Sequence, residues 1–310
     1  CNMRSDAFFA SGRQAALMAG IALFMSGCAG VGSGVPDSPL CWVEFARGDA
    51  PGALGAAGAT AAVWHNTTSG LLVRHPSGNV LIDAGWSAAA AQEMDELHPM
   101  KAAVARRVLG SLAWRTNAPQ ALGAASITPQ ELRYIIPTHG HYDHMAGAVD
   151  LPHVPVLLSA AERGYLQVQA AQPDIVPASN IRALAHRMQT LEFATKPFLG
   201  FERSFDLYGD GSIVIVPLAG HTPGSVGVFI HSGERRIFHV GDAAFVNEAI
   251  ARSLPKSAAL RTFADHDPLS ADAQVVRLAE FARTHPQYAM LPAHDRTAWQ
   301  AIFGDQPGCR

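Results

Sequence analysis

The segment Thr138–His144 reads Thr-His-Gly-His-Tyr-Asp-His and places four side chains with metal-binding atoms within six residues. Directly before it, the apolar run Leu132–Ile136 predicts a short strand, so the segment is expected on the loop after that strand. Imidazole nitrogens and carboxylate oxygens suit zinc and similar divalent cations. The alternating spacing favours a loop, because ligand pairs on a helix stand four residues apart. The fold must therefore support a metal-binding loop at the end of a strand.

Four more candidate residues lie near the ends of other strand-like runs. They are Asp83 after Val-Leu-Ile, His221 in Gly-His-Thr-Pro-Gly, Asp242 in Val-Gly-Asp, and His294 in Leu-Pro-Ala-His. With the His-x-His-x-Asp-His loop, this ordered set resembles the signature of the metallo-β-lactamase superfamily. The resemblance extends from about residue 60 to the C-terminal end of the sequence.

The resemblance implies an α/β (α+β) fold, a four-layer αββα sandwich of two mixed β-sheets flanked by helices. It also implies two divalent metal ions, with Zn²⁺ expected and Fe or Mn as alternatives. The ligands would be His139, His141 and His221 for the first ion, Asp143, His144 and His294 for the second, and Asp242 as a bridge. Seven candidates exceed the four ligands of one tetrahedral zinc, which agrees with two ions. Asp83 would orient a ligand histidine through its ring N–H.

Such a centre is expected to hold a bridging hydroxide that attacks a carbonyl group. Asp143 would hold the hydroxide or pass a proton to the leaving group. The true β-lactamases of the superfamily lack a bridging aspartate at the position of Asp242. The motif pattern of this chain therefore resembles that of the N-acyl homoserine lactonases most. Those enzymes often have a tyrosine three residues after the bridging aspartate, where this chain has Phe245. Tyr142 would replace its hydroxyl as an oxyanion donor.

The substrate pocket is expected to include Phe245, Trp86 and Met145, and the segment 86–128 would form a wall or lid over the site. The apolar residues of that segment fit a protein core equally well. The predicted reaction is the hydrolysis of a lactone or an ester. The alternatives are thioester or β-lactam hydrolysis, an iron-dependent redox enzyme similar to persulfide dioxygenases, and a non-catalytic metal-binding lipoprotein.

The N-terminal residues resemble a bacterial lipoprotein signal. Arg4 and Arg13 precede the apolar run 15–25, which is too short to span a bilayer, and Ser-Gly-Cys ends at Cys28. We expect a signal peptide at residues 1–27, a lipid-attached Gly/Ala/Pro-rich tether at 28–59, and a catalytic domain at 60–310. The protein would be an outer-membrane lipoprotein facing the periplasm, or soluble and exported if it is not lipidated.

The composition agrees with an enzyme that acts on small molecules. The 310 residues carry a net charge of −3, so there is no basic surface for nucleic acid. Membrane contact is expected through the N-terminal lipid only, and the oligomeric state is left open. Cys41 and Cys309 could pair in an oxidising compartment, but two cysteines do not establish a bond.

Local patterns predict the remaining elements. A hairpin is expected at 71–82, helices at 87–112 with a break at His98-Pro99, a helix start at Thr128, and an irregular segment at 47–60. Strands are expected at 154–158, 213–216, 226–230, 236–240 and 288–291, with helices at 159–171 and 269–284. Five other histidines are expected to be structural or solvated, with His266 the closest to a functional motif: His65, His75, His186, His239 and His266.

Overall fold

The structure is a computed structural model, and it describes residues 35–310. The predicted signal peptide, the lipidation site Cys28 and the first part of the predicted tether, residues 28–34, lie outside the described residues. Residues 34–310 form one compact unit. No helix among the described residues is both long enough and apolar enough to cross a membrane.

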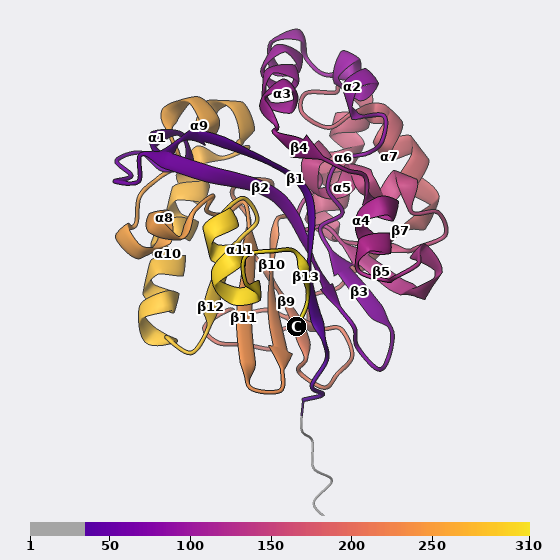
Figure 1. The fold of residues 1–310 in the computed structure, drawn as a ribbon, viewed down its shortest axis with the longest axis vertical. Coiled ribbons are helices and arrows are strands. Elements are labelled where there is room, and N and C mark those ends of the chain that lie inside the picture. Colours follow the sequence, from indigo (N-terminus) through magenta and orange to yellow (C-terminus); the bar gives the residue numbers. More distant parts are fainter. Residues whose placement is uncertain (1–34) are drawn as a thin grey trace, which may run out of the picture. The chain divides into compact units, whose positions relative to one another are not determined.

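Two mixed β-sheets form the centre of the fold (Figure 1). The larger sheet contains, in spatial order, β13 (Gly308–Cys309), β1 (Leu40–Pro51), β2 (Val63–Val73), β3 (Asn79–Ile82), β5 (Leu132–Ile136), β6 (Val156–Ser159) and β7 (Met188–Leu191), with β4 (Trp114–Arg115) paired to β1. The smaller sheet contains β12 (Ala289–Pro292), β11 (Arg235–Gly241), β10 (Val226–Ser232), β9 (Ile213–Pro217) and β8 (Phe205–Asp206).

Most of the helices cover the outer faces of the two sheets, whereas α11 (Arg296–Phe303) packs against the core between the sheets. The other helices are α1 (Gly52–Gly55), α2 (Ala90–Glu93), α3 (Pro99–Ser111), α4 (Ala118–Ala124), α5 (Tyr142–Met145), α6 (Ala160–Ala171), α7 (Ala178–Leu184), α8 (Asn247–Arg252), α9 (Ala258–Ala264) and α10 (Pro268–Thr284). Short 3-10 turns occur at Met94–Glu96, Pro129–Glu131, Ala146–Asp150 and Ala185–Arg187. Figure 1 shows α2 to α7 on one side and α8 to α10 on the other.

Three apolar clusters separate these four layers. Alternate residues of the central strands, such as Leu71 and Val73 in β2 and Val228 and Ile230 in β10, face the core between the sheets. A second cluster joins the larger sheet to α2–α7, and a third joins the smaller sheet to α8 and α10. The predicted four-layer αββα sandwich of two mixed sheets is therefore confirmed.

Strand β1 corrects two predictions. It continues through Pro51, and its residues pair with β2 from Leu40–Val73 to Pro51–Val63. The segment 47–60 is therefore largely regular, and the compact unit begins well before residue 60. Its Ala- and Gly-rich composition suggested an irregular segment, but strand formation depends on the pairing partner more than on intrinsic preference.

The helix start predicted at Thr128 is smaller than expected. Thr128 and Glu131 form a capping box, but it opens only the 3-10 turn Pro129–Glu131, and β5 follows at once. The hairpin formed by β2 and β3 and the helix break at His98-Pro99 are present as predicted.

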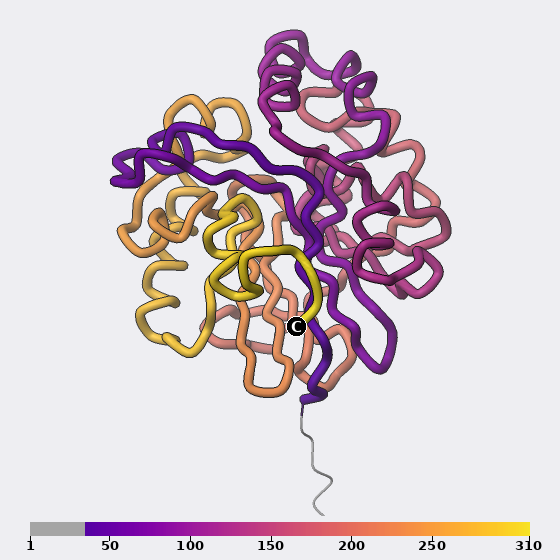
Figure 2. Tube along the Cα trace, in the orientation of Figure 1, coloured from indigo at the N-terminus to yellow at the C-terminus, as the bar shows by residue number. Residues whose placement is uncertain are grey.

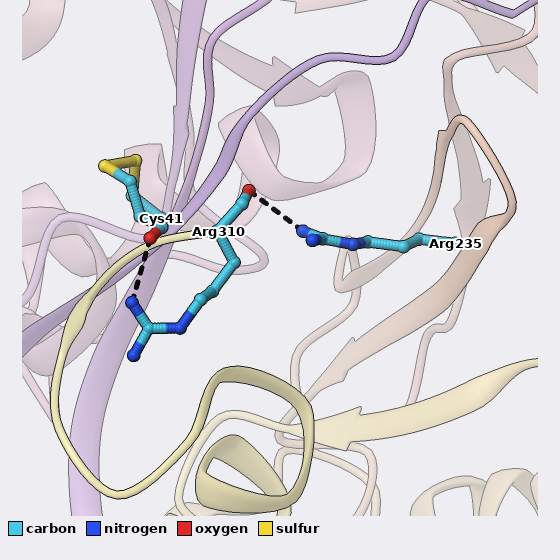
Figure 3. The surroundings of a disulfide bond; sticks show 4 residues. Cys41, Arg235 and Arg310 are labelled. Atoms are coloured by element: carbon cyan, nitrogen blue, oxygen red, sulfur yellow. Dashed lines mark hydrogen bonds between the residues drawn. A yellow bond between two sulfur atoms is a disulfide. The ribbon is translucent and has the colours of Figure 1, made fainter.

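Cys41 and Cys309 form a disulfide that joins β1 to β13 (Figure 3). Leu40 and Arg310 exchange two backbone hydrogen bonds of 3.0 and 2.8 Å beside it. Arg235 at the β10–β11 turn donates to the Arg310 carbonyl at 2.9 Å. The start of β1 and the C-terminal end thus lie side by side, as the tube in Figure 2 shows.

Candidate metal centre

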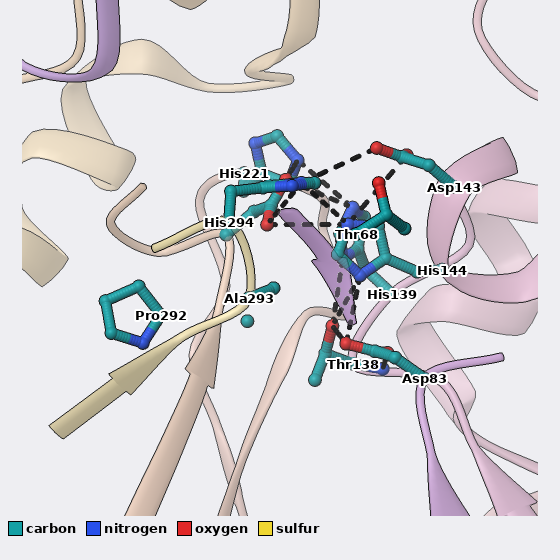
Figure 4. Close-up of polar contacts among 12 residues, drawn as sticks. Thr68, Asp83, Thr138, His139, Asp143, His144, His221, Pro292, Ala293 and His294 are labelled. Carbon is teal, nitrogen blue, oxygen red and sulfur yellow. Dashed lines mark hydrogen bonds and ion pairs between the residues drawn. The ribbon is translucent and has the colours of Figure 1, made fainter. Parts of the chain in front are cut away.

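The predicted ligands come from loops at the ends of five strands, which meet at one edge of the sandwich (Figure 4). Asp83 follows β3, and His139, His141, Asp143 and His144 follow β5. His221 lies between β9 and β10, Asp242 follows β11, and His294 follows β12. His139 and His141 are on the loop, as predicted, whereas Asp143 and His144 lie in the four-residue helix α5. The larger sheet thus supplies one half of the cluster and the smaller sheet the other.

The side chains form two groups of three potential ligands. His139, His141 and His221 form the first, which we call the three-histidine group. Asp143, His144 and His294 form the second, which we call the mixed group; in each group the donor atoms lie within 4.8 Å of one another. All six are buried except Asp143, which is half-buried.

Asp242 stands between the two groups with one oxygen toward each. Its Oδ2 lies 3.3 Å from His221 Nε2, whereas its Oδ1 lies 3.4 Å from His144 Nε2 and 3.3 Å from His294 Nε2. Burial would raise the pKa of Asp242, but His294 and His144 hold it well below 3.8. Both oxygens therefore share a negative charge in the position that a bridging carboxylate would need.

The spacing of the donor atoms suits coordination of metal ions better than direct hydrogen bonds among these side chains. His139 Nε2 lies 3.1 Å from His221 Nε2, and His144 Nε2 lies 3.3 Å from His294 Nε2. A tetrahedral zinc with bonds of about 2.0–2.1 Å separates its ligand atoms by roughly 3.3 Å. Among residues 35–310, the buried His141 Nε2 and Asp242 Oδ1 have no hydrogen-bond partner. Other buried atoms also lack a partner, but these two stand out because both belong to candidate ligand groups, where a bound cation would satisfy them.

The other ring nitrogens of His144 and His294 are held by acceptors. His144 Nδ1 donates to Asp83 Oδ2 at 3.0 Å, and His294 Nδ1 donates to the Thr67 carbonyl at 2.7 Å. These bonds keep the proton on Nδ1 and leave Nε2 free to bind a cation. Asp83 also accepts a 2.6 Å bond from the Thr138 amide, and Figure 4 shows both residues below His139 and His144.

Two residues next to His221, Asp265 and Lys256, were not predicted from the sequence to belong to the site. Asp265 Oδ1 accepts from His221 Nδ1 at 2.7 Å and from Lys256 Nζ at 2.5 Å. Lys256 is buried and lies 4.7 Å from the centre of the Phe245 ring. Asp265 precedes His266, whose motif stood out in the sequence, but only the fold shows that the carboxylate contacts His221.

The residues predicted for the substrate pocket have different positions. Phe245 stacks on Trp64 at 5.6 Å, with its edge toward His294 at 5.6 Å. A cavity of about 230 Å³ is lined partly by Trp64 and by Val246 and Asp295, the residues that follow Phe245 and His294 in the chain; Phe245 itself does not line it. Met145 and Trp86 instead belong to the core between the larger sheet and its helices, with 0 % and 2 % of their surface exposed. In this structure both side chains therefore offer almost no surface to a substrate.

Of the five histidines expected to be structural or solvated, two have carboxylate partners. His75 contacts Asp210 at 3.0 Å, and His65 contacts Asp49 at 2.8 Å. His239 is fully buried in the core near Asp83, and burial lowers its pKa to about 4. The backbone N–H of His266 donates to the His221 carbonyl at 2.8 Å.

Metal affinity is expected to rise with pH through the neutral range. Burial lowers the pKa of His144, but the carboxylates of Asp242, Asp83 and Asp143 outweigh burial and hold it well above 6.5. Without metal the ring therefore binds a proton that a cation must displace, so affinity falls as pH falls through this raised pKa. Competition with a chelator across this range measures the effect, and an affinity that does not change with pH would contradict it.

Comparisons with known proteins agree with this geometry. The family model of the metallo-beta-lactamase superfamily matches residues 63–294. A protein of Mycobacterium tuberculosis named a probable metallo-hydrolase is 28% identical over 244 residues, covering 74% of this chain and 75% of its own. A relative of the same name from Mycobacterium bovis matches equally well.

Solved structures of lactone hydrolases share the fold. An N-acyl homoserine lactone hydrolase, solved with N-hexanoyl-L-homoserine at its catalytic metal centre, has a TM-score of 0.64 and 17% identity, with 86% of this chain and 96% of the other covered. The dizinc quorum-quenching lactonase AidC has a TM-score of 0.60 and 16% identity, covering 84% and 88%. At these identities the likeness concerns the fold alone. The ordered ligand loops, the two-sheet sandwich and the family match together show that the chain belongs to the metallo-β-lactamase superfamily and is a metal-dependent hydrolase.

Proposed function

We propose that this protein uses two divalent metal ions, zinc in the first instance, to hydrolyse lactones or related esters. The observation that carries the proposal is the position of Asp242, with one oxygen toward the three-histidine group and the other toward the mixed group. When bound, two such ions supply an activated water and polarise the substrate carbonyl. The lactone preference is supported by the lactonases that share the fold.

The residues around the two groups would orient the reaction. Asp143 is the most exposed member of the mixed group, and its Oδ2 lies 3.5 Å from His294 Nε2. From this position it would accept a proton at its free oxygen and return it to the leaving alkoxide. The cavity lined partly by Trp64 and Val246 would receive the apolar part of the substrate.

Tyr142 is proposed as the donor to the developing oxyanion. Burial raises the pKa of its phenol well above 10, and the nearby Asp143 and Asp242 carboxylates raise it further. The hydroxyl therefore keeps its proton at neutral pH and is able to donate it in a hydrogen bond.

Tyr142→Phe is expected to lower kcat by about 100-fold with little change in KM, because one oxyanion donor is lost. The ring would keep its packing on Trp86, whose centre lies 4.8 Å away. Steady-state kinetics on the best lactone measures the loss. Tyr165→Phe is the matched control, since Tyr165 also lies near the site, with its ring centre 6.4 Å from that of His141. An equal loss in both variants, or in neither, would contradict the role of Tyr142.

The substrate proposal is tested with the zinc-loaded protein and a panel of carbonyl compounds. The panel contains short- and long-chain acyl homoserine lactones, simple γ- and δ-lactones, aryl esters, a glutathione thioester and a cephalosporin. Lactone opening that stops with a chelator supports the proposal. Turnover of the thioester or the cephalosporin alone would show that the substrate belongs to that class and is not a lactone. Thiol-dependent oxygen uptake with bound iron would show that the enzyme is a redox enzyme and not a hydrolase.

We also propose that the protein is exported and attached to a membrane through a lipid on Cys28. The Cys41–Cys309 disulfide supports export, since disulfides persist in oxidising compartments. Labelling the full chain with a fatty-acid analogue tests the attachment. Label that is retained in Cys28→Ser would overturn it.

A further inference from the structure

Glu162 is a buried carboxylate that joins two of the ligand loops without belonging to the donor set. It lies in the first turn of α6 with 1 % of its surface exposed. Its Oε1 accepts from the Gly140 amide at 2.6 Å. Its Oε2 accepts from the Thr222 hydroxyl at 2.6 Å and from the Gly224 amide at 3.0 Å.

These three bonds favour a charged carboxylate, because every partner is a donor. Ser225 Oγ lies 2.7 Å from Thr222 Oγ1 and can donate to it, so the Thr222 proton is free to point at Glu162. Burial raises the pKa of Glu162, and the three hydrogen bonds, which favour the ionised form, offset only part of that rise. Glu162 thus presents two acceptor oxygens to three donors on the two loops.

The two loops lie so close to α6 that a Cβ at Gly140 or at Gly224 would overlap with atoms of this helix. A Cβ on Gly224 would lie 2.0 Å from the Glu162 backbone nitrogen. A Cβ on Gly140 would lie 2.6 Å from Leu166 Cδ2 and 3.0 Å from Glu162 Oε1. Ser159, the N-cap of α6, adds a 2.8 Å bond to the Gly224 carbonyl. The start of α6 is thus a rigid support for both loops.

The bonds of Glu162 reach residues next to ligands of the three-histidine group, and none next to a ligand of the mixed group. Gly140 lies between His139 and His141, and Thr222 follows His221. The mixed group has separate supports, because Asp83 holds His144 and the Thr67 carbonyl holds His294. Each group therefore has its own buried acceptors.

We propose that Glu162 is a positioning residue that sets the spacing of the three-histidine group and so determines the affinity of that group for its metal ion. The inference rests on the metal binding in the proposed function, but not on the choice of substrate. Residues that orient metal ligands contribute about 10–100-fold to affinity in comparable sites. Glu162→Gln would replace one acceptor oxygen with an NH₂ group facing a donor.

The test measures one group at a time in the full chain. His294→Ala disables the mixed group and leaves the three-histidine group, whereas His221→Ala does the reverse. Glu162→Gln is added to each background, and Co²⁺ and Zn²⁺ affinities are measured by competition with a chromophoric chelator. The visible absorption of bound Co²⁺ reports the coordination geometry. We expect a loss of about 10–100-fold and an altered spectrum in the His294→Ala background, and a change below about threefold in the other.

Two further variants keep the test decisive. Thr222→Val removes one of the three donors and leaves the Glu162 side chain unchanged, so a smaller loss of metal affinity is expected in the His294→Ala background. If Glu162→Gln does not fold, Thr222→Val provides the test. Asp83→Asn is the matched control and is expected to weaken metal binding in the His221→Ala background, because Asp83 holds His144. Equal losses from Glu162→Gln in both backgrounds, or no loss in either, would overturn the proposal. Selective metal loss without lactone turnover would support it while refuting the substrate.

Discussion

His141→Ala is expected to remove hydrolytic activity almost completely, by about a thousandfold or more. Residues that merely orient metal ligands contribute about 10–100-fold, and a direct ligand contributes more. His141 is buried, and its Nε2 has no other partner among residues 35–310. Burial lowers its pKa well below 6.5, so its lone pair is free for a cation at neutral pH. Metal content by mass spectrometry and turnover of the best substrate measure the effect.

A histidine outside the site provides the control for this prediction. His231 is largely buried, though less so than His141, and bonds to Tyr288 at 2.8 Å, but it lies in β10 away from the ligand loops. His231→Ala is expected to lower stability while metal content and specific activity remain. Activity that survives in His141→Ala with two metals bound would show that this histidine is not a ligand.

Loss of the disulfide is expected to cost about 5 kcal/mol of unfolding free energy, because the bond closes a very long loop. Cys41 and Cys309 are separated by 268 positions, so the bond removes much of the freedom of the unfolded chain. Cys309→Ser is the better variant, since Cys309 is partly exposed whereas Cys41 is fully buried. Denaturant unfolding of the metal-free protein measures the difference without a contribution from metal binding.

The reduced parent chain is the control for the disulfide. Under reducing conditions it should unfold at the same denaturant concentration as Cys309→Ser, because both lack only the covalent link. A variant that is as stable as the oxidised parent would show that the bond contributes nothing. A variant far less stable than the reduced parent would assign the effect to packing at β13 instead.

The metal centre could be predicted from the sequence because its ligands occur in short local motifs. His139, His141 and His144 are close together in the chain, and each of the distant ligands ends a recognisable apolar strand. Strand ends meet at one edge of a sandwich, so local patterns were sufficient to bring these residues together. The structure adds which oxygen of Asp242 faces which group.

The supports of the centre could not be predicted, because they depend on contacts between distant segments. Glu162 and Asp265 lie 60 and 44 positions from the residues they bond, Thr222 and His221. Neither carboxylate stands in a pattern that distinguishes it from a solvated side chain. Met145 shows the converse, since its place beside the metal motif suggested a pocket although its side chain points into the core.

The pairing of β1 with β2 could not be predicted from the sequence either. Its second half is rich in small residues, and its strand conformation comes from its ladder with β2. The cysteines were consistent with a bond, but only the adjacency of β1 and β13 makes it possible.

The division of ligands between the two sheets has a consequence for how the protein matures. The three-histidine group takes two ligands from the loop after β5 and one from the loop after β9. The mixed group takes two from the segment after β5 and one from the end of β12. Neither half of the chain contains a complete group, so under the proposed two-metal centre a newly made polypeptide would not hold either ion in full coordination until its two halves have docked. Full metal binding would then follow the docking of the two halves, so that metal-loaded molecules would be those that have completed folding.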